Sequence, residues 1–486
     1  MTDIRCPLSE AARRYKDLPA VISDDRIISY GQYDQLVASA ASRLKNVGVT
    51  PGERVAVVSP NFIKFPILLM ALFRIGAVAC PISPCLPQQT VAEYIKKIGC
   101  SKIFDLTNQL HIDKSFGITT LPVAEIIDFT SAGATASGDH FVSLDQEATI
   151  IATSGTSAQP KAVLHTYGNH YYSAIGSNKN IKVQPSDRWL LSLPLYHVGG
   201  LAILFRTMLG GGAVVMANMD ADLLDTIRKY QVTHLSLVHT QLYRLLHKKP
   251  GRDEIKGLSA LLVGGSAIPR ALITQAYECG LPLFTSYGLT EMTSQVITTN
   301  PGDSLDRLLT SGRLLDHHQV RISSEGEILV KGDTLFCGYV EQDEVFLPVD
   351  SDGWFHTGDL GRLDDTGYLT VRGRMDSMFV SGGENIHPEE IEGTLSLLDD
   401  VSDAVVVPVE DDEFGFRPVA FIRTEGNKHV YKSDLVTRLE QYLPRFKIPT
   451  RFYKWPETAQ HSDVKPSRRY FRELVLAASH KLTELT

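Results

Sequence analysis

The chain has 486 residues, a formal net charge of −8 at pH 7 and a hydrophobic content of 43%. This length is too great for a single hydrophobic core, so at least two domains are expected. No stripe of lysine and arginine offsets the acidic balance, which argues against nucleic acid as a partner.

Cysteine usage and hydropathy indicate the compartment. Six scattered cysteines without a C-x-x-C pair predict neither a zinc site nor a disulfide framework. The first residues lack the charged and apolar regions of a signal peptide. Two long apolar stretches, 65–83 and 193–216, are interrupted by Arg74 and Arg206, which favours buried core over a membrane span. We therefore expect a soluble, cytoplasmic protein with no membrane span.

Short apolar runs alternate with helical patterns in two regions of the chain. The first region predicts strands over 54–60, 77–82 and 102–105, with helices over 62–75 and 88–99. The second region predicts strands over 187–192, 212–216, 233–237, 259–263 and 282–286, with helices over 200–209, 221–230, 239–247 and 269–279. This alternation predicts an α/β fold with mixed or parallel sheets and flanking helices.

The last third of the chain changes pattern. Residues 310–374 carry strands and turns without helices and predict a small β subdomain. Residues 375–486 return to mixed α and β patterns and are long enough for a core of their own. We predict an N-terminal domain over 1–374 and a smaller α+β domain over 375–486.

A loop of small hydroxyl residues lies between two apolar runs in 151–165, which predicts strand, turn, strand. Hydroxyl groups and exposed backbone N–H groups can surround phosphate oxygens, and a lysine adds a mobile point charge. The candidate phosphate-binding residues are Thr153, Ser154, Gly155, Thr156, Ser157 and Lys161. The residues after the lysine favour a strand, unlike the helix-opening phosphate loop. From the loop alone, an ordinary flexible connector stays open as the alternative.

The stretch TSGTSAQPKA resembles the TSGTTGxPKG phosphate loop of the adenylate-forming superfamily, which includes acyl-CoA synthetases, luciferases and peptide-synthetase adenylation domains. Ala158 and Ala162 stand where that pattern has glycine, which leaves less freedom for positive φ. The resemblance implies a large N-terminal domain, a mobile C-terminal lid and the use of ATP and Mg²⁺.

Two glycines end the predicted strand at 259–263 and are followed by a predicted helix. This segment, 261–269, resembles the loop of the superfamily that lies on the adenine side of the nucleotide. The resemblance implies nucleotide contacts by Gly264, Gly265 and Ser266. An ordinary tight turn is the alternative.

The segment 285–292, TSYGLTEM, follows the next predicted strand and matches the YGxTE motif of the superfamily. Ligands bind beyond the carboxyl ends of strands in open α/β sheets. The resemblance implies that Tyr287 stacks near adenine, that Thr290 reaches the α-phosphate and that Glu291 holds Mg²⁺ as a hard carboxylate ligand. Ser286 and Gly288 complete the nucleotide-binding segment. A solvated glutamate at a helix start is the alternative to the metal role.

The segments WFHTGDL and VRGRMDSMFVSGGENIHP resemble the ribose-binding turn, hinge and following loop of the superfamily. The resemblance implies that Asp359 accepts from the ribose hydroxyls, that Arg374 touches ribose or phosphate, and that Asp376 is the hinge. Phe379-Val380 replaces an Ile-Lys pair found elsewhere in the superfamily, so any role of that lysine is absent.

Two later features complete the resemblance. Gly382 and Gly383 would line a path for the thiol of coenzyme A. Lys465 occupies the place of the catalytic lysine, although Val464 replaces the usual preceding glycine. A solvated lysine in a polar tail is the alternative.

Segments 192–200, 238–242, 381–388 and 412–419 narrow the resemblance to o-succinylbenzoate–CoA ligases. Their substrate carries an aromatic ring and a second, unreactive carboxylate, which demands a cation or several donors when buried. The candidate pocket residues are His197, Arg206 and Ser236. An arginine whose head reaches water and a core histidine are the respective alternatives for Arg206 and His197.

The resemblance thus implies an ATP-dependent carboxylate–CoA ligase that works through an acyl-adenylate. Its partners would be a small carboxylate, ATP and coenzyme A, and a homo-oligomer stays open. Two rivals remain: an aryl- or fatty-acyl-CoA synthetase of another substrate range, and a non-catalytic nucleotide- or acyl-binding relative. The presence of Lys465 and Glu291 disfavours the second rival, while Ala158, Ala162 and Val464 keep it open.

Overall fold

The computed structural model describes residues 3–110, 117–129, 139–153, 161–218, 221–248, 255, 257–265, 268–342, 344–375, 377–381, 384–411, 414–424, 430–456, 468–477 and 482–486. The chain divides into two compact units. Unit 1 consists of Met1–Gly265, Tyr277–Val320 and Val330–Phe355, and unit 2 of Ser266–Ala276, Arg321–Leu329 and His356–Thr486. The expected domain boundary between residues 374 and 375 stays a prediction.

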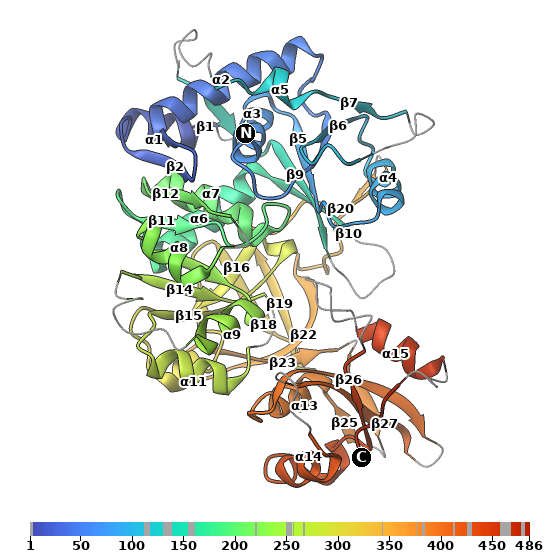
Figure 1. Cartoon of the computed structure of the whole chain (residues 1–486). Coiled ribbons are helices and arrows are strands. Elements are labelled where there is room, and N and C mark those ends of the chain that lie inside the picture. The colour runs from blue at the N-terminus through green and yellow to red at the C-terminus, as the bar shows by residue number, and fades with distance from the viewer. Residues whose placement is uncertain are drawn as a thin grey trace. The chain divides into compact units, whose positions relative to one another are not determined.

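Unit 1 contains an eight-stranded sheet in the order β21-β20-β10-β9-β5-β4-β6-β7 (Figure 1). Its strands are β4 (Arg54–Val58), β5 (Val78–Ile82), β6 (Lys102–Asp105), β7 (Thr119–Thr120), β9 (Glu147–Thr153), β10 (Lys161–Thr166), β20 (Gly338–Glu341) and β21 (Glu344–Phe346). The strands β4, β5 and β6 run parallel, whereas β10 pairs antiparallel with β9 and β20. The sheet is therefore mixed.

Unit 1 also contains a nine-stranded sheet in the order β17-β16-β15-β14-β13-β11-β12-β2-β3. Its strands are β2 (Pro19–Ser23), β3 (Ile27–Ser29), β11 (Arg188–Leu190), β12 (Ala213–Met216), β13 (His234–Leu237), β14 (Ala260–Val263), β15 (Leu283–Leu289), β16 (Ser294–Thr298) and β17 (Arg313–Leu314). The run from β12 to β15 is parallel, so the carboxyl ends of these strands lie at one edge. A separate pair joins β1 (Asp3–Arg5) to β8 (Phe141–Ser143).

Among the described residues up to 310, the helices are α1 (Pro7–Arg14), α2 (Tyr30–Asn46), α3 (Lys64–Ile75), α4 (Gln88–Lys97), α5 (Val123–Ile126), α6 (Tyr167–Asn180), α7 (Val198–Gly210), α8 (Leu223–Tyr230), α9 (His239–His247), α11 (Arg270–Glu278) and α12 (Leu305–Leu308). Every helix and strand predicted in 54–105 and 187–286 is present, with ends that differ by a few residues at most. The predicted α/β fold class is confirmed.

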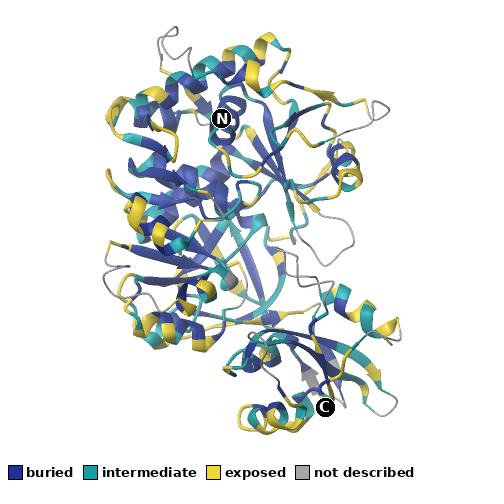
Figure 2. Cartoon of the chain, in the orientation of Figure 1, coloured by how far each residue is buried: buried dark blue, intermediate teal, exposed yellow. Residues whose placement is uncertain are grey.

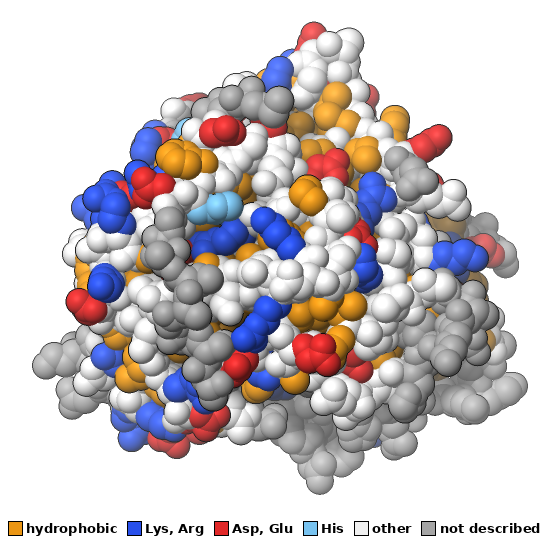
Figure 3. Space-filling view, turned by 90° about the horizontal axis from the view of Figure 1, so that it is seen from above, with side chains coloured by type: hydrophobic (Ala, Val, Ile, Leu, Met, Phe, Trp, Pro, Cys, Tyr) orange, Lys and Arg blue, Asp and Glu red, His pale blue; other side chains and the backbone are white. Residues whose placement is uncertain are grey.

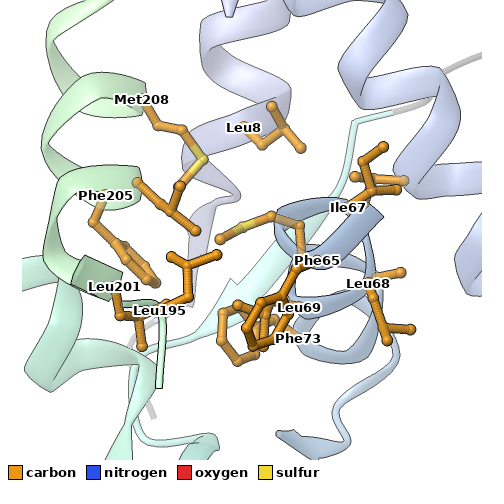
Figure 4. Close-up of a cluster of buried hydrophobic side chains, with 14 of the residues drawn as sticks. Leu8, Phe65, Ile67, Leu68, Leu69, Phe73, Leu195, Leu201, Phe205 and Met208 are labelled. Carbon is orange, nitrogen blue, oxygen red and sulfur yellow. The ribbon is translucent and has the colours of Figure 1, made fainter. Parts of the chain in front are cut away.

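Packing between helices builds the main core of unit 1. Side chains of α3 and α7 point toward one another, with Leu8 of α1 beside them (Figure 4). Phe73 and Phe205 lie at the centre of this contact, with ring centroids 6.2 Å apart. The two long apolar stretches of the sequence are thus buried core, as predicted, and each consists of a helix followed by a strand. In the described part of the chain, no helix is long and apolar enough to cross a membrane.

Residues 310–374 do not form one sheet. The strands β20 and β21 join the eight-stranded sheet and β17 joins the nine-stranded sheet. The remaining strands, β18 (His318–Ile322), β19 (Glu327–Gly332), β22 (Phe355–Leu363) and β23 (Leu369–Arg374), form a four-stranded sheet in this order. The segment is all-β among its described residues, as predicted, but its strands are shared among three sheets.

The C-terminal part of unit 2 has its own core. Its three-stranded sheet runs in the order β26-β27-β28, and a two-stranded sheet joins β24 to β25. The elements are β24 (Phe379–Ser381), β25 (Glu384–Ile386), α13 (Pro388–Leu395), β26 (Val401–Asp411), β27 (Gly415–Thr424), α14 (Lys432–Leu439), β28 (Arg451–Lys454) and α15 (Arg468–Leu476). Apolar side chains of these strands and helices form a cluster within the unit.

Burial follows the sheets, whose strands are largely dark blue in Figure 2, while exposed residues gather on helices and loops. On the face seen in Figure 3, basic and acidic side chains are interspersed instead of being separated by sign.

Candidate functional site

The strands that flank the predicted phosphate loop form a hairpin. β9 and β10 pair antiparallel, with Thr153 opposite Lys161, which confirms the two predicted strands. Thr153 ends β9 and Lys161 begins β10, so both lie at the same end of the hairpin. The predicted loop residues between them, Ser154, Gly155, Thr156 and Ser157, lie outside the described residues, as does Ala158.

The predicted adenine-side loop lies at the carboxyl end of β14. Gly265 has a φ of +81°, a conformation that glycine adopts at little cost. A Cβ atom on Gly264 would lie 3.2 Å from the carbonyl oxygen of Ser286, in the middle of the neighbouring strand β15. The close approach of the chain after β14 to the backbone of β15 therefore favours glycine at 264. Ser266 lies outside the described residues.

Glycine at position 288 is required by strand packing. A Cβ atom there would lie 1.9 Å from the carbonyl oxygen of Ser294, where β15 pairs with β16 through an irregular register. Tyr287 is buried, and Ser286 donates to the carbonyl of Ile297 at 2.9 Å. This packing sets the direction in which the chain leaves β15 for Thr290.

Glu291 lies in a short 3₁₀ turn, η2 (Thr290–Met292), directly after β15. Its Oε1 accepts a hydrogen bond from the Tyr339 hydroxyl at 2.7 Å. The Nζ atom of Lys161 lies 4.7 Å from the centroid of the same tyrosine ring. Tyr339 thus contacts both a candidate phosphate-binding lysine and a candidate metal-binding glutamate.

A buried chain of polar side chains supports the backbone of Thr290. Nε2 of His165 lies 2.7 Å from the carbonyl oxygen of Thr290, and Nδ1 lies 3.2 Å from the hydroxyl of Thr149. Because a carbonyl only accepts, Nε2 carries the proton and Nδ1 accepts from Thr149. The Thr149 hydroxyl then accepts from Nε2 of His170 at 2.9 Å. Burial lowers the pKa of His165 to about 4, so the ring is neutral at pH 7.

Arg206 lies on α7 and is 1% exposed. Its guanidinium carbon lies 5.4 Å from the Trp189 ring centroid, and Nη2 donates to the Ser294 hydroxyl at 3.3 Å. Nε has no hydrogen-bond partner, and no described acidic residue forms an ion pair with the guanidinium. Burial lowers the pKa of Arg206 to about 9. The alternative of an arginine that reaches water is therefore wrong.

The other two candidate pocket residues differ in burial. Ser236 is buried, and its hydroxyl accepts from Nε1 of Trp189 at 3.0 Å, so Arg206 and Ser236 both contact Trp189. His197 is exposed at the N-terminus of α7, beside the ring of Tyr196 at 4.8 Å. The alternative of a core histidine is wrong for His197.

In unit 2, Asp359 and Arg374 face each other across the antiparallel pair of β22 and β23. Nη1 of Arg374 donates to Oδ1 of Asp359 at 3.3 Å. Gly358 has a φ of +71°, and a Cβ atom there would lie 3.1 Å from Nη2 of Arg374. The positive φ within β22 therefore favours glycine before Asp359, whereas the contact with Arg374 involves only the end of a flexible side chain.

Arg468 of unit 2 begins α15, three positions after the candidate lysine. Its guanidinium is surrounded by acceptors at 2.8–3.0 Å. They are the carbonyl of Val406, the hydroxyl of Ser377, and the carboxylates of Glu389 and Glu392. Ser377 directly follows the candidate hinge, so Arg468 ties the start of α15 to the hinge segment. Asp376, Gly382, Gly383, Val464 and Lys465 lie outside the described residues.

Three residues that hold the candidate groups were not predicted from the sequence: His165, Tyr339 and Arg468. Each is a polar side chain in or beside an apolar segment, which is a weak signal for a role in a site. Their partners lie 125, 48 and up to 91 residues away in the chain, so no local pattern could identify the contacts.

Known proteins are similar to this chain over nearly its whole length. Residues 8–340 match the family described as AMP-binding enzyme, and residues 390–461 match the AMP-binding enzyme C-terminal domain. A 2-succinylbenzoate–CoA ligase of Bacillus cereus is 32% identical over 473 residues, which cover 94% of this chain and 96% of that protein.

Two solved structures of o-succinylbenzoate CoA synthetase from Bacillus subtilis resemble this fold, each at 29% sequence identity. The complex of that enzyme with its acyl-adenylate intermediate gives a TM-score of 0.85 and covers 94% of this chain and 95% of that one. The complex with ATP and a magnesium ion gives a TM-score of 0.84 and covers 93% and 96%.

Proposed function

The chain belongs to the AMP-binding enzyme family, and on this premise we propose that it is an ATP-dependent ligase that joins 2-succinylbenzoate to coenzyme A. The product of such a reaction is 2-succinylbenzoyl-CoA, and the reaction is a step of menaquinone biosynthesis. The relatives named for this activity support the proposal, because the similarity extends over almost the full length of both chains.

One observation carries the choice of substrate. A buried guanidinium without an acidic partner costs free energy in the ligand-free protein, so its presence calls for an anion that arrives from outside. The unreactive ring carboxylate of 2-succinylbenzoate is such an anion. The Trp189 ring lies beside Arg206 and is itself buried, and its Nε1 donates to the hydroxyl of buried Ser236. His197 adds an exposed polar group at the start of the helix that carries Arg206.

In the first half-reaction, the succinyl carboxylate oxygen attacks the α-phosphorus of ATP, the bond to the β-phosphate oxygen breaks, and pyrophosphate leaves. Catalysis of this step is positioning and charge stabilisation. We assign the polyphosphate to Lys161, the 153–157 loop and Thr290, and adenine to Gly264, Gly265, Ser266 and the 286–288 segment. Lys465 supplies a donor to the charge that develops at the α-phosphate.

The Glu291 carboxylate fits a magnesium ligand. Tyr339 occupies only Oε1, and no other described residue forms a hydrogen bond or an ion pair with this carboxylate, which leaves an oxygen for a hard cation. When bound, Mg²⁺ supplies charge neutralisation for the phosphate oxygens. In unit 2, Arg374 orients the Asp359 carboxylate toward a ribose, whose hydroxyls donate to it.

In the second half-reaction, the thiol sulfur of coenzyme A attacks the activated carbonyl carbon, the bond to AMP breaks, and the thiol proton passes to solvent. No covalent enzyme intermediate is needed. Lys465 and the thiol path past Gly382 and Gly383 cannot face the acyl carbon together, so residues 377–486 rotate about Asp376 between the two steps. The enzyme acts in the cytoplasm, where ATP and coenzyme A are supplied.

The test is pyrophosphate release from ATP, measured with a panel of carboxylic acids and coenzyme A. The panel includes 2-succinylbenzoate, benzoate, 4-oxo-4-phenylbutanoate and a medium-chain fatty acid. We expect 2-succinylbenzoate to give the highest kcat/KM by at least tenfold. Preference for benzoate or the fatty acid would assign another acyl-CoA synthetase activity, and no release with any acid would support a non-catalytic relative.

A further inference from the structure

Tyr339 lies between two groups of opposite charge. It belongs to β20, which pairs antiparallel with β10, the strand that Lys161 begins. Its hydroxyl donates to Oε1 of Glu291 at 2.7 Å, and its ring centroid lies 4.7 Å from Nζ of Lys161. Lys161 and Glu291, both described, form no ion pair with each other. The tyrosine therefore contacts both charges while they stay apart.

We propose that Tyr339 is a positioning residue that holds Glu291 for the metal ion and Lys161 for the polyphosphate, through two separable contacts. The proposal rests on the ATP and Mg²⁺ use of the proposed function. The Tyr339 hydroxyl positions Glu291 for the metal ion, and the face of the Tyr339 ring positions Lys161 for the phosphates.

The hydroxyl contact suits a metal-binding carboxylate because it orients the group without neutralising its charge. A lysine or arginine at the same place would form an ion pair and compete with the incoming cation. A phenol is uncharged and donates one hydrogen bond. Glu291 is therefore oriented by an uncharged partner, and Oε2 accepts no hydrogen bond from a described donor.

The ring contact suits a phosphate-binding lysine for the same reason. The face of an aromatic ring attracts an ammonium group through its quadrupole and accepts no full hydrogen bond. The three N–H donors of Lys161 thus stay available to phosphate oxygens.

Neighbouring contacts hold the backbone of this region without the Tyr339 hydroxyl. The N–H of Phe336 donates to the carbonyl of Glu291 at 2.9 Å, and the Thr293 hydroxyl donates to the carbonyl of Thr334 at 2.9 Å. The Phe336 ring meets the Tyr339 ring edge to face at 4.9 Å. Removal of the hydroxyl alone should therefore leave the fold of η2 and β20 intact.

The test compares Tyr339→Phe, which removes the hydroxyl, with Tyr339→Leu, which removes the ring as well. Calorimetry of ATP binding over a series of Mg²⁺ concentrations gives a readout that needs no acyl substrate. We expect Tyr339→Phe to raise the Mg²⁺ concentration for half-maximal effect by about 10-fold or more, as for loss of a hydrogen bond to a charged group. At saturating Mg²⁺, its ATP affinity should stay within about twofold of wild type.

We expect Tyr339→Leu to show the same Mg²⁺ effect and also to lose ATP affinity by about threefold or more at saturating Mg²⁺, since the lysine loses its support. The control is Tyr33→Phe, which removes the hydroxyl of a buried tyrosine that has no hydrogen-bond partner, whereas Tyr339 is half-buried. That variant should bind Mg²⁺ and ATP as wild type does.

An unchanged Mg²⁺ dependence in Tyr339→Phe would overturn the hydroxyl contact as a positioning device. An unchanged ATP affinity in Tyr339→Leu would overturn the ring contact. A wild-type protein that binds no ATP at any Mg²⁺ concentration would instead refute the proposed function, and this inference with it. A double-mutant cycle with Glu291→Gln adds a further check, because Tyr339→Phe should have little additional effect once the carboxylate is gone.

Discussion

Replacement of Arg206 by leucine should have opposite effects on the empty protein and on substrate binding. In the ligand-free protein, the guanidinium is buried with one hydrogen bond, to Ser294, and a ring contact with Trp189. The fall of its pKa from 12.5 to about 9 means that the folded protein disfavours the charged guanidinium by a free energy of about 5 kcal/mol. The hydrogen bond and the ring contact together offset about 3 kcal/mol of this cost.

The cost of the buried charge exceeds what the two contacts offset. Arg206→Leu should therefore stabilise the ligand-free protein by about 1–2 kcal/mol, because a buried charge is exchanged for an apolar side chain. Binding of 2-succinylbenzoate should weaken at the same time. Loss of a charge-assisted contact costs about 2–3 kcal/mol, which corresponds to a rise in KM of roughly 30- to 150-fold. The acid without the ring carboxylate, 4-oxo-4-phenylbutanoate, should be affected far less.

The assay combines thermal denaturation of the ligand-free protein with steady-state kinetics on the two acids. Arg74→Leu is the matched control, since Arg74 is also largely buried but pairs with Asp34 at 2.5 Å. That variant leaves a buried carboxylate without its partner and should lower the melting temperature. Two results would show that Arg206 is a structural residue and does not bind the ring carboxylate. One is that Arg206→Leu lowers the melting temperature as Arg74→Leu does, and the other is that the KM rises equally for both acids.

Three further predictions concern catalysis, motion and pH. Lys465→Ala should slow adenylate formation by about 100-fold or more and spare thioester formation from supplied acyl-adenylate, because a donor to the α-phosphate serves only the first step; equal losses in both steps would exclude that role. Asp376→Pro should leave adenylation intact and abolish thioester formation, since proline fixes φ and traps the orientation with Lys465 at the nucleotide; near-normal thioester formation in a half-reaction assay would place the pivot elsewhere. Burial holds the pKa of His165 at about 4 against an ordinary 6.5, so the unfolded chain binds the proton more tightly and stability falls as pH drops through this window, by about 2 kcal/mol at pH 5. His165→Gln keeps a donor and an acceptor, and should reduce the loss of melting temperature between pH 7 and pH 5; an unchanged loss would assign it to other groups.

Much of the fold was predictable because its signals are local. The helices α3 and α7 are apolar on all sides, and the strands between them are short apolar runs bounded by glycine and proline. Such patterns depend only on neighbours in the chain, so the elements in 54–105 and 187–286 were predicted with nearly correct ends. The division of 310–374 among three sheets was missed, since strand pairing depends on partners far away in the sequence.

The candidate site divides in the same way. Residues proposed to touch the nucleotide lie in loops of small residues at strand ends, which stand out in the sequence; Gly265 and Gly288 are examples. The resemblance to a known family assigned their roles, and the structure adds the reason for each glycine. The burial of Arg206 was left open, because a single arginine in an apolar helix is compatible with both a buried and a water-reaching side chain.

The residues that hold the site are less visible for a physical reason. His165 and Thr149 face each other across β9 and β10, so each occupies an inward position that the strand pattern assigns to an apolar side chain. A buried polar group is costly unless it is hydrogen-bonded, and here the bonds form one directed chain that ends on the carbonyl of Thr290. The hydrogen bond from His165 to the carbonyl of Thr290 therefore offsets the cost of burying the ring and also fixes the turn that carries Glu291. In a sequence of this kind, polar residues at inward positions of otherwise apolar strands are thus candidates for the side chains that hold the site in place.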